Sequence, residues 1–542
     1  MTTELTEIGK ASPRLPLEPG AGRMTHYRWI VLGLVFLGTT VNYADRMVIA
    51  ILAPDLQSQY TISDAQYGYI NAVFGLAYAF GQLLSGGILD KIGTRLGYAL
   101  ALAGWSVCAM LTALGRGALS FGIFRGMLGF TEAPAFPAAA KACAEWFPRR
   151  QRAFAFGFVN AGTNMGAILA PWIVPILATN YGWEWAFIVT GGLGFVVLAL
   201  WIPLYRRPAD HPSISQAELA FIHSDPPEPE SAAIPGVLDL RPFSFRGRID
   251  AATCTGIVVV LGLLAIGVGP LVAITVRETR GTAAQPVGLA VLAASLGLAA
   301  WIIVSTILQR RNDIAARKIG SAEPAPVTNL VGHRRAWVFA MGKFITDPMW
   351  GFYILWLGKF LHDNYNVDTR HIGPPLIAIY VMSDLGSIAG GWLSSTMIRR
   401  GYSVNRARKT AFFVSALLVV PIVLAPQVNS LWTAVFILGL ATAGHQAFSS
   451  NLYTLCSDLF PKRAVASVAG FGGTFGWIGV SLFQAFIGLW VNYYHNYWGP
   501  FVAAAAAYLV AFGVIHLLAP RLGPPAGSEG GGFEASAVGP SD

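Results

Sequence analysis

Charged residues are scarce in this chain. Only 12% of its 542 residues are Asp, Glu, Lys or Arg, about half the share of a soluble domain. Hydrophobic residues make up 54%, and the mean hydropathy is +0.54. Apolar stretches of roughly 20 residues recur, the length at which an α-helix crosses the hydrocarbon of a bilayer. Because backbone groups in lipid must be hydrogen-bonded within their own segment, we predict an all-α polytopic membrane protein.

Cysteine is equally scarce. The four cysteines, Cys108, Cys143, Cys254 and Cys456, lie in or beside apolar stretches and show no metal-ligand spacing. We expect buried thiols there. The chain also lacks a nucleophile elbow, so the sequence predicts neither an enzyme nor a bound metal or cofactor. The first apolar segment lacks a small-residue cleavage site, and we predict that it is a true span rather than a signal peptide.

The net charge of +9 might suggest a nucleic-acid partner, but the loop pattern excludes it. Lys and Arg cluster in the joints after the second, fourth and sixth apolar stretches, for example at Lys91, Arg95, Arg149, Arg150, Arg206 and Arg207. The alternate joints contain almost none. This is the positive-inside pattern, so both termini are predicted to face the cytoplasm of a cell (inner) membrane.

The apolar stretches divide the chain into two blocks of six. We predict an N-terminal six-helix bundle at 24–206, with spans at about 27–52, 66–89, 96–115, 118–140, 153–178 and 184–205. A C-terminal six-helix bundle at 336–520 has spans at about 336–361, 371–397, 409–426, 430–452, 464–490 and 497–519. A transmembrane hairpin is inserted at 251–309 between cytoplasmic linkers 207–250 and 310–335, which gives about fourteen spans. The arms 1–23 and 521–542 are polar and are predicted to be disordered.

Ionisable residues within the spans follow a pattern. A charge at mid-span costs about 2.5–3.5 kcal/mol on insertion scales. We therefore expect each of these residues to have a structural or functional role. They gather on the first, fourth, seventh and tenth core spans, which begin the four three-helix units, as Asp45 and Arg46, Arg125 and Glu132, Lys343 and Asp347, and His445 with Gln446. If the units are related by repeat symmetry, these four helices meet around one central cavity.

Spacing adds detail to this cavity. Arg125 and Glu132 share a helix face, and Lys343 and Asp347 are four residues apart and can pair directly. Polar faces on the fifth and second spans suit a wet, sugar-sized cavity, and they comprise Asn160, Thr163, Asn164, Tyr78 and Gln82.

Several of these residues admit a second interpretation. Asp45 with Arg125, and Arg46 with Glu132, could be structural ion pairs rather than titrating groups. Lys343–Asp347 could be a gate or a substrate contact, and Asp384 a packing or gating group. His445 could carry a proton or simply be hydrogen-bonded in the core. Trp350 could stack on a sugar ring or only pack.

One loop resembles a known signature. The stretch Gly86-Gly87-Ile88-Leu89-Asp90-Lys91-Ile92-Gly93-Thr94-Arg95 is similar to the loop between the second and third helices of the major facilitator superfamily. The resemblance implies that Asp90 caps and pairs with neighbouring helix ends and that Gly93 permits a tight turn. We expect Asp90 and Arg95 to act in gating. Two six-helix bundles joined by a cytoplasmic linker are also the plan of that superfamily. The second copy of the loop, at 391–395, has lost its acid.

A second motif narrows the resemblance. Asn42-Tyr43-Ala44-Asp45-Arg46 resembles the motif of the anion:cation symporter family, and Arg125 to Glu132 extends the match. The stretches around Thr346-Asp347, Ser383-Asp384, Gly444-His445-Gln446 and Ser457-Asp458 resemble bacterial hexuronate transporters. Thr163 and Lys343 depart from residues common in that branch.

The resemblance implies alternating-access symport of a sugar acid, such as glucuronate or galacturonate, with protons. Asp45 and Glu132 would carry the protons, and Arg46 and Arg125 would manage the substrate carboxylate or those acids. Tyr43, Tyr78, Asn160 and Thr163 match cavity positions. We expect a monomer in a lipid bilayer, with a small organic anion and protons as its partners. Transport of an aldonate, aldarate or other anion, or a sensor that does not transport, are the alternatives.

Overall fold

The computed structural model describes residues 24–224, 334–459, 462–520 and 522, without the side chains of residues 86, 87, 90, 91, 149, 150, 153, 156, 334, 456–458 and 462–467. The predicted hairpin 251–309, most of both predicted linkers and both terminal arms lie outside the described residues. The prediction of about fourteen spans therefore stays a prediction.

The N-terminal half is built from long helices. They are α1 (Arg28–Ile51), α2 (Ala53–Tyr60), α3 (Asp64–Thr112), α4 (Ala118–Glu132), α5 (Ala135–Trp146), α6 (Arg149–Tyr181) and α7 (Trp183–Leu204). The short elements η1 (Pro208–Asp210) and α8 (Gln216–Ile222) follow within the predicted linker. The six predicted spans of this half therefore all coincide with helix.

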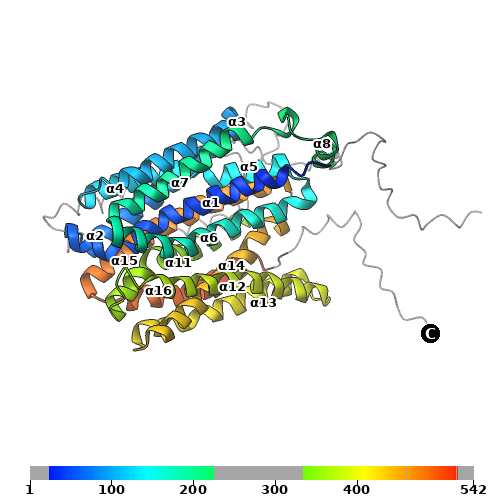
Figure 1. The fold of residues 1–542 in the computed structure, drawn as a ribbon. Helices are drawn as coiled ribbons and strands as arrows, with labels where there is room; N and C mark the ends of the chain where they lie inside the picture. Colours follow the sequence, from blue (N-terminus) through cyan, green and yellow to red (C-terminus); the bar gives the residue numbers. More distant parts are fainter. Residues whose placement is uncertain (1–23, 225–333, 460–461, 521, 523–542) are drawn as a thin grey trace, which may run out of the picture.

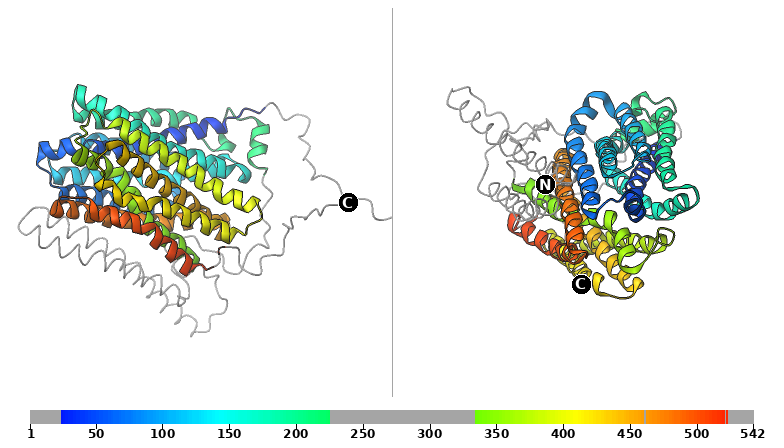
Figure 2. Two further views of the ribbon diagram at one scale, coloured as in Figure 1. Left: turned by 90° about the horizontal axis from the view of Figure 1, so that it is seen from below. Right: turned by 90° about the vertical axis from the view of Figure 1, so that its left-hand side faces the viewer.

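The C-terminal half repeats this plan. Its helices are α11 (Arg334–Tyr365), α12 (Gly373–Arg399), α13 (Val404–Val419), η4 (Val420–Gln427), α14 (Leu431–Leu459), α15 (Lys462–Tyr494) and α16 (Trp498–Leu518). Figure 1 shows the two halves side by side, with the axes of their helices roughly parallel. Figure 2 (right) shows the same arrangement end-on, with the N-terminal half in blue and cyan and the C-terminal half in green to red. The all-α fold of two helical bundles is confirmed.

The two ends of the bundle are distinguished by which helices begin and end there. We call the end where α1 begins and α16 ends the terminal face, and the opposite end, where α1 ends and α2 lies, the far face (Figure 1). The basic joints identified in the sequence lie at the terminal face.

Four predicted spans differ in detail from the observed helices. The second and third spans are joined in α3, and only Gly93 departs from helical geometry, with φ of 80° and ψ of 164°. This confirms the turn expected at Gly93, because a side chain is strained in that region. The fourth span is divided between α4 and α5 at Pro134, which cannot donate a helical hydrogen bond. The ninth begins earlier than predicted and ends in the 3₁₀ helix η4, whose first turn holds a proline.

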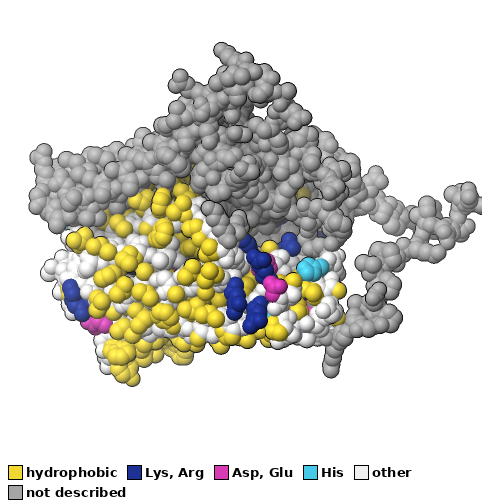
Figure 3. All heavy atoms as spheres, turned by 90° about the horizontal axis from the view of Figure 1, so that it is seen from above, with side chains coloured by type: hydrophobic (Ala, Val, Ile, Leu, Met, Phe, Trp, Pro, Cys, Tyr) yellow, Lys and Arg dark blue, Asp and Glu magenta, His cyan; other side chains and the backbone are white. Residues whose placement is uncertain are grey.

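The outer surface is that of a membrane protein. Nine described helices or helix segments are long and apolar enough to cross a bilayer. Large apolar side chains stand exposed on them, such as Trp172 on α6 and Ile388 on α12, at 63% and 71%. Figure 3 shows one face, on which a broad apolar band separates charged side chains near its two ends. The predicted spans 66–89, 118–140 and 336–361 carry many of the candidate site residues.

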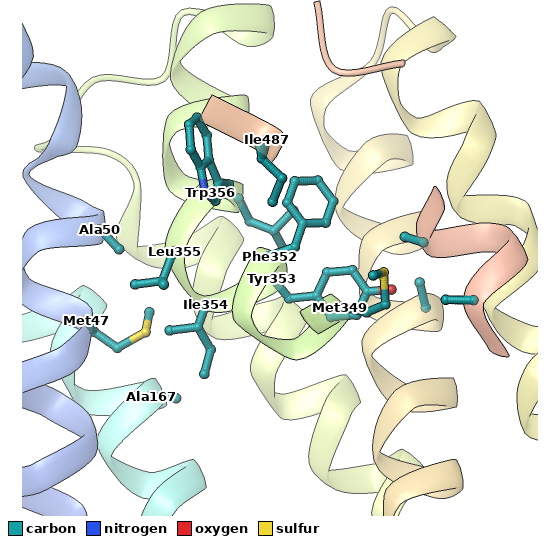
Figure 4. Close-up of a cluster of buried hydrophobic side chains, with 14 of the residues drawn as sticks. Met47, Ala50, Ala167, Met349, Phe352, Tyr353, Ile354, Leu355, Trp356 and Ile487 are labelled. Atoms are coloured by element: carbon teal, nitrogen blue, oxygen red, sulfur yellow. The ribbon is translucent and has the colours of Figure 1, made fainter. Parts of the chain in front are cut away.

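Apolar side chains fill the contact between the halves. Met47 and Ala50 of α1 face Ile354 and Leu355 of α11 (Figure 4). The first part of α3 runs along α15, and at Gly68 and Gly488 the two backbones touch: a Cβ atom built on Gly68 would lie 2.7 Å from the Gly488 Cα. Only glycine fits such an approach.

The start of α1 is held by the segment that follows α7. Glu218 of α8, whose side chain is fully buried, accepts hydrogen bonds from the backbone N–H groups of Tyr27 and Arg28, at 2.8 and 3.2 Å. It also accepts from the Thr25 hydroxyl at 2.6 Å and pairs with the Arg28 guanidinium at 2.9 Å. Since the first N–H groups of a helix have no partner within it, Glu218 caps α1 from a distant part of the sequence.

Candidate functional site

A buried ion pair joins α1 to α4. The Arg46 Nε lies 2.6 Å from the Glu132 Oε2, and the two side chains are 5% and 0% exposed. The Asn42 side-chain oxygen, one turn earlier on α1, accepts a second hydrogen bond from Arg46 at 3.0 Å. One of the two ion pairs suggested by the sequence is therefore confirmed.

Aromatic rings surround the same guanidinium. Its carbon lies 4.7 Å from the ring centre of Tyr43, 4.8 Å from Tyr78, 5.3 Å from Trp477 and 5.7 Å from Phe74. Cations over aromatic faces are attracted by the ring quadrupole. Trp477 comes from α15 in the other half and packs on Tyr78 with ring centres 4.2 Å apart. The N-terminal ion pair is thus partly covered by a side chain of the C-terminal half.

The second suggested pair, Asp45 with Arg125, is not formed among the described residues. Both side chains are buried, at 1% and 0% exposure, and their carboxylate and guanidinium atoms make no hydrogen bond of ordinary geometry there. Successive residues are about 100° apart around a helix, so Arg46 facing α4 turns Asp45 towards α7, where it interacts with Thr190. Arg125 instead lies 4.3 Å over the ring of Phe74.

The polar face predicted on α6 is present, with differing exposure. Asn160 is exposed, Asn164 half-buried and Thr163 buried. The Thr163 hydroxyl donates to the Asn160 backbone carbonyl at 2.7 Å, so its proton is directed along its own helix. On α3, Gln82 is half-buried beside Gly473 of α15, and its side-chain oxygen accepts no hydrogen bond from the described residues.

The C-terminal half has a charged cluster on α11. The Lys343 Nζ lies 2.8 Å from the Asp347 Oδ2, which confirms the pairing expected from their spacing. Lys343 also donates to the Tyr453 hydroxyl of α14 at 3.1 Å. Tyr43 of α1 interacts electrostatically with Arg46 of its own half and with Lys343 of the other half.

His445 of α14 belongs to an aromatic cluster. Its ring stacks on Trp350 with centres 4.9 Å apart and planes inclined by 5°, and its Nδ1 lies 2.6 Å from the Tyr508 hydroxyl. Gln446, the next residue, is half-buried. The structure therefore brings His445 and Trp350 together.

The predicted gating residues lie apart from these clusters. Arg95 at the terminal face donates to the Ile202 carbonyl of α7 at 2.6 Å, and the Trp201 indole donates to the Arg95 carbonyl at 3.0 Å. The side chain of Asp90 lies outside the described residues. Asp384 is half-buried on α12, and its Oδ1 accepts no hydrogen bond from the described part of the chain.

The sequence did not single out Trp477 or Tyr453. Both are aromatic residues within apolar spans, where packing is the usual role of such residues, and only their contacts with Arg46 and Lys343 distinguish them. Cys108 and Cys143 are buried free thiols, as predicted. The described residues contain no group of three His, Cys, Asp or Glu side chains that could hold a metal ion.

Comparison with known families identifies a match over half of the chain. The model of the Major Facilitator Superfamily matches residues 35–308. The chain is 26% identical to the hexuronate transporter of Escherichia coli K12 over 463 residues, which cover 85% of this chain and 87% of that protein. It is also 26% identical to the galacturonate transporter of Dickeya chrysanthemi (72% and 89% covered) and to the probable galactarate/D-glucarate transporter GarP of Escherichia coli K12 (90% and 93%).

Solved structures share the fold. A bacterial homologue of the human lysosomal transporter Spinster aligns with a TM-score of 0.61 at 16% identity, covering 92% of this chain and 98% of that one. The xylose transporter XylE of Escherichia coli aligns with a TM-score of 0.57 at 14% identity, covering 94% and 100%. The match to the Major Facilitator Superfamily agrees with the prediction that the chain is not an enzyme.

Proposed function

Because the chain belongs to the Major Facilitator Superfamily, we propose that it is a secondary transporter that carries a hexuronate, such as glucuronate or galacturonate, together with protons. It is a multi-pass membrane protein related to hexuronate and galactarate/glucarate transporters. The observation that carries the proposal is the buried group of two acids and two cations in the N-terminal half, Asp45, Glu132, Arg46 and Arg125.

Charge balance in this group supports proton coupling. With both acids ionised, the four side chains sum to zero, and Glu132 holds Arg46. Protonation of Asp45 and Glu132 leaves two guanidinium groups in a buried site without a counter-charge. A substrate carboxylate then offsets one of the two positive charges, and arginine binds carboxylates with paired N–H donors. Proton uptake therefore favours binding of an organic anion, and release of the protons favours its departure.

The remaining candidate residues supply the rest of the proposed substrate site. We assign hydroxyl recognition in the N-terminal half to Tyr43, Tyr78, Gln82, Asn160, Thr163 and Asn164. The C-terminal half contributes Lys343, Asp347, Trp350, His445 and Gln446. Tyr43 interacts electrostatically with both Arg46 and Lys343, which supports a site in which one sugar-sized anion contacts both halves.

The orientation of the proposed cycle follows the loop charges. The terminal face, with its Lys and Arg residues, faces the cytoplasm of the inner membrane. Asp90, Arg95 and Asp384 act in the movement between the halves, and the transporter works as a monomer. Substrate and protons enter from the far face and leave at the terminal face.

Substitution Asp45→Asn tests the proton role. The variant keeps the volume of the side chain but cannot ionise, so we expect uptake of glucuronate driven by a pH gradient into proteoliposomes to fall at least about tenfold. Counterflow exchange without a gradient is retained. Glu184→Gln is the matched control, because Glu184 pairs with Arg116 on the N-terminal half alone. Gradient-driven uptake that persists in Asp45→Asn would contradict the proposal.

A thermal-shift screen tests the substrate class. Purified protein is heated with uronates, aldonates and aldarates at two pH values. A hexuronate is expected to raise the melting temperature most, and more at the lower pH, because protonated acids free the arginines. A larger shift from an aldarate would replace hexuronate by dicarboxylate in the proposal. Binding without flux in proteoliposomes would favour a sensor instead.

A further inference from the structure

A lysine at the far face joins the two halves. Lys359 of α11 is buried, and its Nζ lies 3.1 Å from the Asp64 Oδ1 of α3 and 2.8 Å from the Asp363 Oδ2 of its own helix. The first contact crosses between the halves and the second does not. We call these three residues the far-face latch.

Each acid of the far-face latch has a further partner in its own half. The Gln57 side chain of α2 donates to the Asp64 Oδ1 at 2.9 Å, and the Tyr497 hydroxyl donates to the Asp363 Oδ2 at 2.7 Å. Asp64 is also the first residue of α3, where a carboxylate is stabilised by the helix dipole and by free N–H groups.

Two neighbouring contacts close the same face. The Thr369 hydroxyl of the C-terminal half donates to the Asp55 Oδ2 of α2 at 2.6 Å. The Tyr67 hydroxyl of α3 donates to the Leu355 carbonyl of α11 at 2.7 Å. Separation of the two halves at the far face therefore requires all three cross-half contacts to break.

The contact between Lys359 and Asp64 can break without leaving either charged group unpaired. When α3 moves away, Lys359 remains paired with Asp363, and Asp64 retains Gln57 and the start of its helix. A buried charge that loses its only partner is strongly destabilising, whereas here each group keeps a second partner. The contact therefore stabilises the closed arrangement while leaving the open one accessible, as an alternating transporter requires.

We propose that Lys359, through Asp64, holds the far face closed and so directs the substrate site to the terminal face. Lys359 is a positioning residue, since it acts on the halves rather than on the substrate. The inference rests on the proposed function, because only alternating access needs a far face that opens and closes.

The test measures the far face without substrate or a proton gradient. Spin labels at Ser58 of α2 and Arg370 of the C-terminal half, both exposed, report the distance across the far face in purified full-length protein. We expect Lys359→Met and Asp64→Asn to raise the long-distance population at least about twofold. Lys359→Arg retains the charge and should restore the wild-type distribution.

A variant at another acid of the far face serves as the control. Glu184→Gln removes another far-face acid whose partner lies in its own half, so its distance distribution should match the wild type. Unchanged distributions in both Lys359→Met and Asp64→Asn would overturn the proposal. Should Lys359→Met fail to fold, the isosteric Asp64→Asn decides alone. The readout is independent of Asp45, so failure of proton coupling and failure of the far-face latch are distinguishable.

Discussion

Lys343 and Asp347 form a buried ion pair whose stability depends on the presence of both members. Both belong to α11, and their charged atoms lie 2.8 Å apart. Removing two charges from water is expensive, and their attraction offsets this only while both are present. The pair is therefore sensitive to loss of one member and tolerant of loss of both.

This gives a prediction for Lys343. Substitution Lys343→Met leaves Asp347 buried without its cation and should destabilise the protein by about 3–5 kcal/mol. The double variant Lys343→Met with Asp347→Asn should recover most of that loss. Thermal unfolding in detergent measures both, and a double variant no more stable than the single one would show that Asp347 is not held by Lys343.

At the scale of single residues, the sequence predicted the pairs that spacing or charge could specify. Lys343–Asp347 follows from helical geometry, and Arg46–Glu132 from the presence of opposite charges on two pore-lining spans. The alternative pair of Asp45 with Arg125 is not formed among the described residues, because adjacent residues on α1 face different helices. Trp477 was not predicted, because its role depends on a contact between halves about 430 residues apart in sequence.

Among the helices, α8 makes a contact with the start of α1 whose contribution to stability depends on pH. Burial by itself raises the pKa of Glu218, but hydrogen bonds from Thr25, Tyr27 and Arg28 hold it below its ordinary value of 4.5. Burial lowers the pKa of His211, beside it, below 6.5. Both groups prefer their deprotonated form in the folded state. Their contribution is thus complete above pH 6.5 and declines as the pH falls, first through His211 and then through Glu218.

Hydrogen exchange of the start of α1 checks this. We expect the amides of Tyr27 and Arg28 to begin losing protection as the pH falls below 6.5 and to lose more of it below 4.5, after correction for the intrinsic exchange rate. Glu218→Gln should lose protection already at neutral pH, since a charge-assisted hydrogen bond contributes about 1.5–3 kcal/mol. If Glu218→Gln is as protected as the wild type, α8 does not hold α1.

The break in α3 gives a second prediction at this scale. Gly93→Ala places a side chain in a backbone region that costs about 1–3 kcal/mol, so the melting temperature should fall. Gly157→Ala on α6, where an added Cβ meets nothing within 4 Å, is the control and should be neutral or stabilising. Equal effects of the two substitutions would contradict a special role for Gly93.

Hydropathy predicted these elements well in position but not in form. Length and apolarity locate a span, whereas a kink at Gly93, a division at Pro134 or a 3₁₀ turn after Val419 depends on local backbone geometry. The helix α8 was not predicted, because seven residues in a polar linker carry too weak a periodic signal. Its capping role is visible only once α1 and α8 meet.

For the whole molecule, the loop charges predict orientation. A fluorescent protein fused to the C-terminus should fold and fluoresce, and a phosphatase that needs the periplasm should be inactive there, because we propose that the terminal face is cytoplasmic. The reverse result would invert the proposed direction of the cycle while leaving the site chemistry unchanged. The bundle plan was available from sequence because both halves repeat one hydropathy pattern. The contact between them was not, because it is set by shape.

The touching backbones of Gly68 and Gly488 have a consequence for the history of the sequence. A Cβ on either residue would collide with the other's backbone, so neither position can gain a side chain while the helices keep this separation. Substitutions at these two sites, about 420 residues apart, are therefore coupled. Across diverging descendants we expect both to stay glycine or to change in step, and a library that varies them jointly should yield functional combinations absent from either single-site library.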